Sequence, residues 1–76
     1  MPHVIIKLQS GRSDQQKAKI AEEVTKAITS GANCTEAAVS VSIKDIEADD
    51  WVKTVYKPDI IQKRDTLYKN PGYDPL

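Results

Sequence analysis

Two short runs with the periodicity of β-strands flank one long amphipathic helix, and this order constrains the fold more than any other feature of the chain. The first run, His3 to Leu8, is rich in β-branched residues and places Val4, Ile6 and Leu8 on one face. The second run, which begins at Val39, alternates apolar and polar residues with a period of two. We therefore expect a β-α-β unit of the α/β (α+β) class, with each strand covered on one face.

The stretch between these runs carries the signals of a helix from Ser13 to Ser30. Ser13 and Gln16 form an S-x-x-Q capping box, and Asp14 lies in the first turn, where the helix dipole favours an anion. The apolar positions trace one helical stripe: Ile20, Ala21, Val24, Ala27 and Ile28. Such a helix spans about 25 Å at roughly 1.5 Å per residue, so the second strand can return parallel to the first. The expected product is a right-handed β-α-β unit.

The last third of the chain predicts a helical segment with a break. Trp51 to Tyr56 and Ile60 to Lys69 indicate two helices with acidic starts, and Pro58 breaks or kinks the path between them. The three tyrosines of this region are interpreted as packing residues in preference to general acids, with the alternative that a C-terminal tyrosine reaches the pocket. No repeat or linker divides the sequence, so we expect a single domain over residues 1–76.

The size and composition of the chain limit its partners. At 76 residues only about 60% of the unfolded surface can be buried, so a chain of this size needs a disulfide, a metal or a partner chain. Cys34 is the only cysteine, and no Cys and His cluster has ligand spacing. We therefore expect no metal and no cofactor, which leaves oligomerisation. The formal net charge of zero and the dispersed lysines argue against nucleic acid.

The hydropathy pattern bears on location. No apolar stretch approaches the roughly 20 residues of a membrane span, and the N-terminal region lacks the apolar core of a signal peptide. We therefore expect a cytoplasmic protein with no membrane partner.

Pro2 directly follows Met1, so removal of Met1 leaves a secondary amine at the start of the first strand. Such an amine can accept a proton, whereas the same nitrogen in an unprocessed chain is an inert amide. In a parallel pair both strands start at one edge, so Pro2 is expected near Ser40. Arg12 and Trp51 lie beyond the opposite strand ends, about 20 Å away. We expect a two-fold axis to bring Arg12 and Trp51 of one chain to Pro2 of another.

A seven-residue segment after the first strand carries a resemblance to a known family. The segment reads Gly11-Arg12-Ser13-Asp14-Gln15-Gln16-Lys17. With Pro2 ahead of it, it resembles the 4-oxalocrotonate tautomerase family, whose members begin with a catalytic proline. The ending Asn70-Pro71-Gly72-Tyr73 is similar to that of a dimeric bacterial subgroup, whereas the short hexameric members end in a β-hairpin. The resemblance implies a tautomerase-like fold, a homodimer in preference to a hexamer, and a sheet extended by dimerisation.

The resemblance also implies roles for individual residues. Pro2 would be the general base of a keto-enol tautomerase that acts on a 2-hydroxyalkenoate or an arylpyruvate enol. Arg12 would bind the carboxylate of this small molecule, and Trp51 and Leu8 would form an apolar wall. Ser40 stands where the family has a second arginine. We therefore expect a substrate with one carboxylate.

Plainer alternatives stand beside these assignments. On composition alone, Arg12 is a solvated turn residue and Trp51 is a core or interface anchor. The acidic residues from Asp45 to Asp50 are explained by capping and solvation. A second interpretation of the whole chain is a catalytically inactive oligomeric binding protein that keeps the fold, which the absent arginine at Ser40 favours.

Overall fold

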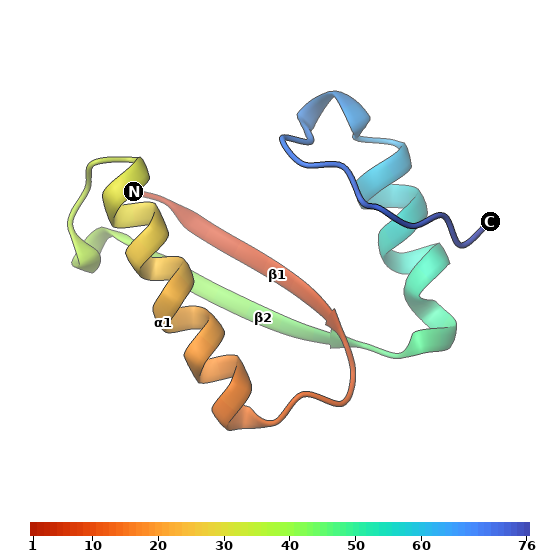
Figure 1. Cartoon of the computed structure of the whole chain (residues 1–76), viewed down its shortest axis with the longest axis horizontal. Coiled ribbons are helices and arrows are strands. Elements are labelled where there is room, and N and C mark those ends of the chain that lie inside the picture. Colours follow the sequence, from red (N-terminus) through yellow and green to blue (C-terminus); the bar gives the residue numbers. More distant parts are fainter.

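The fold is a β-α-β unit followed by a C-terminal helical segment. The computed structural model describes residues 1–76, and strand β1 (His3–Gln9), helix α1 (Asp14–Gly31) and strand β2 (Ser40–Ile46) follow one another in the chain. The two strands form a parallel sheet whose register runs from His3 opposite Ser40 to Gln9 opposite Ile46. Figure 1 shows α1 lying across one side of this sheet. The predicted fold class and the parallel pairing are confirmed.

Helix α1 begins where the sequence predicts because its capping box is formed. The Ser13 hydroxyl accepts a hydrogen bond from the Gln16 backbone N–H at 3.1 Å, and the Gln16 side chain accepts one from the Ser13 backbone N–H at 2.8 Å. These two bonds satisfy N–H groups that have no partner inside the helix. The helix continues through Gly31, one residue beyond the predicted end.

The single chain buries very little of its apolar surface. Only Ile46, Val55 and Tyr56 are buried among all 76 residues, each with at most 5% of its surface exposed. Ile5, on the face of β1 turned away from Val4 and Ile6, keeps 64% of its surface exposed. The core of the isolated chain is therefore small, and it lies between the end of β2 and the C-terminal segment.

The C-terminal segment, residues 47–76, differs from the prediction of two helices separated at Pro58. After the short turn η2 (Ala48–Asp50), one helix, η3 (Val52–Ile61), runs through Pro58 with the wider π-type spacing. In an α-helix the proline ring clashes with the carbonyl four residues earlier. The wider turn pairs groups five residues apart, as in the 3.0 Å bond from the Gln62 N–H to the Lys57 carbonyl, and so accommodates the ring.

The predicted helix from Ile60 to Lys69 is wrong beyond Ile61. That stretch holds only the single turn η4 (Arg64–Thr66). Between residues 62 and 69 only Leu67 is even partly buried, so no apolar stripe is present to hold a helix against the rest of the chain.

The C-terminal segment attaches to the β1 side of the sheet and then folds back along its own helix. Lys7 of β1 forms an ion pair with Asp59 of η3. The rings of Tyr56 and Tyr73 lie 5.7 Å apart at an angle of 42°. In Figure 1 the last residues, in dark blue, cross η3 on their way to the C-terminus. No helix of the chain combines the length and the apolar composition that crossing a membrane requires.

Candidate active site

A cleft of about 370 Å³ opens at the carboxyl end of β1. The β-α-β unit contributes Leu8, Gln9 and Arg12 to its lining, and the C-terminal segment contributes Trp51, Tyr73 and Pro75. Three of the residues expected in a site from the sequence, Leu8, Arg12 and Trp51, thus line one cavity within a single chain.

Arg12 supplies the only cationic side chain of this cleft. It follows Gly11, whose φ of 129° belongs to backbone that favours glycine, so the chain turns sharply after β1. The Arg12 Nη1 donates a hydrogen bond to the Gln9 carbonyl at 3.1 Å, which holds the side chain against the strand end. Arg12 takes part in none of the ion pairs of the chain. Most of its five N–H donors remain available to an anion.

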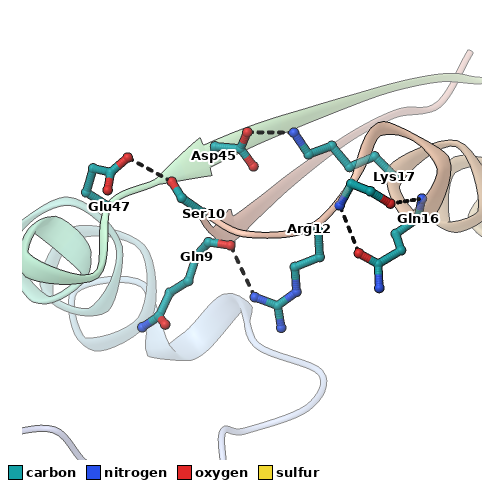
Figure 2. Close-up of polar contacts among 8 residues, drawn as sticks. Gln9, Ser10, Arg12, Gln16, Lys17, Asp45 and Glu47 are labelled. Carbon is teal, nitrogen blue, oxygen red and sulfur yellow. Dashed lines mark hydrogen bonds and ion pairs between the residues drawn. The ribbon is translucent and has the colours of Figure 1, made fainter.

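The nearby carboxylates are engaged elsewhere and do not neutralise Arg12. Asp45 accepts from the Lys17 ammonium at 2.5 Å, and Glu47 accepts from the Ser10 hydroxyl at 3.0 Å. Figure 2 shows both contacts on the far side of the turn from the Arg12 guanidinium. Neither side chain caps a helix, so the capping expected of these acidic residues is wrong for this pair, which instead makes contacts with the turn and with α1.

Trp51 and Tyr73 form the aromatic wall of the cleft. The indole Nε1 of Trp51 donates a hydrogen bond to the Tyr73 hydroxyl at 3.0 Å. The Tyr73 ring in turn lies against Tyr56, which is only 3% exposed. The wall is therefore anchored in the small core of the molecule.

Pro2 and Ser40 lie at the other end of the sheet. The Ser40 backbone N–H donates to the Pro2 carbonyl at 3.2 Å, and the His3 Nδ1 and Ser40 Oγ share a hydrogen bond of 2.6 Å. Gln9 lies seven positions after Pro2, which is about 23 Å of strand at roughly 3.3 Å per residue. The predicted separation of Pro2 from Arg12 within one chain is confirmed by this register.

Sequence reasoning missed Gln9 and Pro75 as lining residues, and it did not single out Tyr73 among the three tyrosines. Tyr73 was interpreted first as a packing residue, with the alternative that a C-terminal tyrosine reaches the pocket, and it is both packed and at the cleft. The packing interpretation is wrong for Tyr68, which is fully exposed. The Pro71-Gly72 pair signals a chain reversal before Tyr73. No local pattern indicates that this reversal brings Tyr73 to Trp51.

Comparison with known proteins gives consistent results. The family described as "Tautomerase enzyme" matches residues 2–55. The chain is 37% identical over 76 residues to a probable tautomerase of Xylella fastidiosa (strain 9a5c), which covers 100% of this chain and 93% of that protein. It is 33% identical over 75 residues to tautomerase PptA of Cronobacter sakazakii (strain ATCC BAA-894), covering 97% and 99% of the two chains. Among solved structures, YwhB, a homologue of 4-oxalocrotonate tautomerase, superposes with a TM-score of 0.61 at 33% identity, over 63% of this chain and 79% of that one.

Proposed function

This chain belongs to the tautomerase family, whose activity is that of an isomerase, and from that premise we propose that it interconverts the keto and enol forms of a small acid with one carboxylate. The observation that carries the proposal is that Arg12, which forms no ion pair, lines the same cleft as the aromatic side chain of Trp51. The substrate class is an arylpyruvate enol or a 2-hydroxyalkenoate.

Pro2 is the proposed general base. Once Met1 is removed, the Pro2 nitrogen is a secondary amine with a free lone pair. It accepts the proton of the enol hydroxyl, and the resulting ammonium delivers a proton to C3. The C2–C3 double bond is thereby replaced by a C2–O double bond and a new C3–H bond, with no net gain or loss of atoms. General acid–base catalysis of this kind contributes about 100- to 10,000-fold in rate.

Arg12 is the proposed carboxylate-binding residue, with Trp51 and Leu8 as the apolar wall. A planar guanidinium can form two parallel hydrogen bonds with a carboxylate. The lining contains a single cation, which supports a substrate with a single carboxylate. Ser40, at the opposite end of the sheet, carries a neutral hydroxyl that is hydrogen-bonded to His3. It therefore does not supply the positive charge that a second arginine would supply.

The proposed assembly is a homodimer in which each site combines two chains. Within one chain the cleft and Pro2 are about 23 Å apart along the strand, so they cannot act on one small molecule. A two-fold axis that places two β-α-β units in opposite directions brings Arg12 of one chain toward Pro2 of the other. The exposed Ile5 and the small buried core support the need for such a partner. The C-terminal segment supports a dimer over a hexamer, because it forms the helix η3 and a single turn where the short hexameric members of the family end in a β-hairpin.

Replacement of Pro2 tests the base directly. For Pro2→Ala we expect kcat/KM for phenylenolpyruvate ketonisation to fall at least about 100-fold, because alanine offers a primary amine of different basicity and shape. Mass spectrometry of each sample establishes that Met1 is absent. A native sample that retains Met1 is the matched control and should be inactive, since its Pro2 nitrogen is an amide. Equal rates for native protein and Pro2→Ala would exclude Pro2 as the base.

Mixing two impaired variants tests the shared site. Pro2→Ala and Arg12→Ala chains, unfolded together and refolded, should form heterodimers in about half of the dimers. Each heterodimer then holds one site with both native residues, so about a quarter of the native activity should return. A site formed within one chain would give no recovery on mixing.

Arg12→Ala alone should act on substrate binding. Hydrogen bonds to a charged partner contribute about 1.5 to 3 kcal/mol, so we expect kcat/KM to fall about 10- to 100-fold, mainly through KM. Arg12→Lys should recover part of this loss, because lysine keeps the positive charge but lacks the planar guanidinium that forms two parallel hydrogen bonds. The control is Arg64→Ala, an exposed arginine of η4 outside the cleft, which should be close to native.

The second candidate function is a non-catalytic oligomeric binding protein with the same fold. The observation that favours it is Ser40, where the strand start carries a hydroxyl in place of a cation. Mass spectrometry of the protein purified from its own cells distinguishes the two, because retention of Met1 there would leave the Pro2 nitrogen as a non-basic amide and would favour the binding protein.

A further inference from the structure

We propose that the Tyr73 hydroxyl is a substrate-recognition group that donates a hydrogen bond to the oxygen on C2 of an acid whose carboxylate is held by Arg12. The inference rests on the proposed function of the cleft and extends it to a residue that determines which acids are accepted. Tyr73 would thus select 2-oxo and 2-hydroxy acids over acids that lack this oxygen.

The hydrogen bonding of Tyr73 leaves one donor unused. An indole N–H can only donate, so in the 3.0 Å contact with Trp51 the phenol oxygen must be the acceptor. A phenol has one O–H donor besides its lone pairs. None of the hydrogen bonds of the chain uses the Tyr73 hydroxyl as a donor. The proton is therefore available to an acceptor that enters the cleft.

The position of Tyr73 is held from two sides. Its ring lies against the buried Tyr56, and its oxygen is fixed by the half-buried Trp51. Tyr73 itself is 48% exposed, and it lines the cleft together with Arg12. A donor held in this way needs little reorganisation to meet a ligand oxygen, which favours specific recognition.

The chemistry of the lining specifies the ligand. The Arg12 guanidinium is suited to bind a carboxylate, and the Tyr73 hydroxyl is a neutral hydrogen-bond donor suited to a carbonyl or hydroxyl oxygen. Trp51 and Leu8 provide apolar surface for the remainder of the molecule. A 2-oxo acid with an aromatic or extended apolar group offers a carboxylate, an adjacent oxygen and an apolar part together. An acid without the C2 oxygen leaves the Tyr73 donor unpaired, which weakens its binding.

Two ligands that undergo no keto-enol exchange in the assay isolate this contact from catalysis. Benzoylformate carries a ketone on C2 and has no C3 proton to lose, whereas phenylacetate lacks the C2 oxygen. Calorimetric titration of the native oligomer should show benzoylformate binding about three- to tenfold more tightly, as expected for one hydrogen bond. Tyr73→Phe, which keeps the ring on Tyr56, should bind the two with nearly equal affinity. The matched control Tyr68→Phe changes a fully exposed tyrosine and should keep the native preference.

The outcomes separate this inference from the proposed function. A native protein without a preference for benzoylformate, or a Tyr73→Phe variant that keeps it, overturns the role of Tyr73 even if ketonisation is fast. A native protein that lacks ketonisation but shows a preference dependent on Tyr73 overturns the proposed tautomerase activity and supports recognition of 2-oxo acids by the cleft. Emission of Trp51, the only tryptophan, reports whether the aromatic wall is intact in each variant.

Discussion

The β-α-β unit, residues 3–46, and the C-terminal segment, residues 47–76, are built on different principles. In the β-α-β unit a parallel ladder and a capped helix form from short, regular signals in the sequence. The C-terminal segment has a π-type helix and single turns, and it is held by a few contacts between residues far apart in the chain. The first region depends on local pattern and the second on its surroundings.

The cleft takes different chemistry from these two regions. The β-α-β unit contributes the charge, because the turn after β1 holds Arg12 at the strand end. The C-terminal segment contributes the aromatic wall through Trp51 and Tyr73. The regular region thus supplies the cation of the cleft. The irregular region supplies the aromatic wall and the neutral donor of the cleft.

The largest effect on stability is expected at the joint between the regions. Ile46 ends β2 and is 4% exposed in the core that joins the strand to η3. Ile46→Ala should lower the free energy of unfolding by about 2 to 5 kcal/mol in urea titration, and Ile46→Val by about 0.5 to 1.5 kcal/mol. If Ile46→Ala unfolds like the native protein, the C-terminal segment is not anchored through this residue and the contrast between the regions fails.

The next largest loss of stability is expected when the N-cap hydrogen bond of α1 is removed. Ser13→Ala removes the hydroxyl that accepts from the Gln16 N–H, so the free energy of unfolding should fall by about 1 kcal/mol. Ser30→Ala, at the exposed far end of the same helix, is the matched control and should change stability by less than about 0.5 kcal/mol. Similar losses for both serines would mean that helix packing, and not the cap, sets the start of α1.

A smaller effect is expected from the ion pair that links the regions. The Lys7 and Asp59 side chains are each 30% exposed. A double-mutant cycle with Lys7→Met and Asp59→Asn should give a coupling energy of about 0.5 to 1 kcal/mol that decreases in high salt. The pair between Lys53 and Asp50 lies within the C-terminal segment at 76% and 46% exposure, and its coupling should be near zero. Equal coupling in both pairs would show that the link between regions has no special role.

The smallest effect belongs to the outer face of α1. The Lys19 ammonium, hydrogen-bonded to Glu23, lowers the pKa of that carboxyl below its ordinary value of 4.5. The ionised Glu23 carboxylate therefore stabilises the fold when the pH is above the ordinary pKa of the group. This stabilisation is lost as the pH falls through the lowered pKa. In urea titrations from about pH 3 to pH 6, the free energy of unfolding of Glu23→Gln should therefore fall less steeply with decreasing pH than that of the native protein. The difference should disappear in high salt because the pair is exposed; persistence there would argue against a surface ion pair.

Much of the β-α-β unit could be predicted because its signals act over a few residues. The capping box at Ser13 and the alternation of the second strand indicate the correct elements within one or two residues. Parallel pairing followed from the length of the helix, and it separated Pro2 from Arg12 correctly. The C-terminal prediction failed because Pro58 breaks an α-helix but not the wider π-type turn that this chain forms.

The sequence by itself determined the β-α-β order, the start of α1 and the presence of a cationic residue after β1, because periodicity, capping and turn chemistry are local. Only the tertiary structure decided that Tyr73 meets Trp51 and that both line one cleft with Arg12. That contact joins residues 22 positions apart across a chain reversal, and its geometry depends on how η3 packs against the end of β2. Long-range packing of this kind is set by the sum of many weak contacts, which no short sequence pattern records.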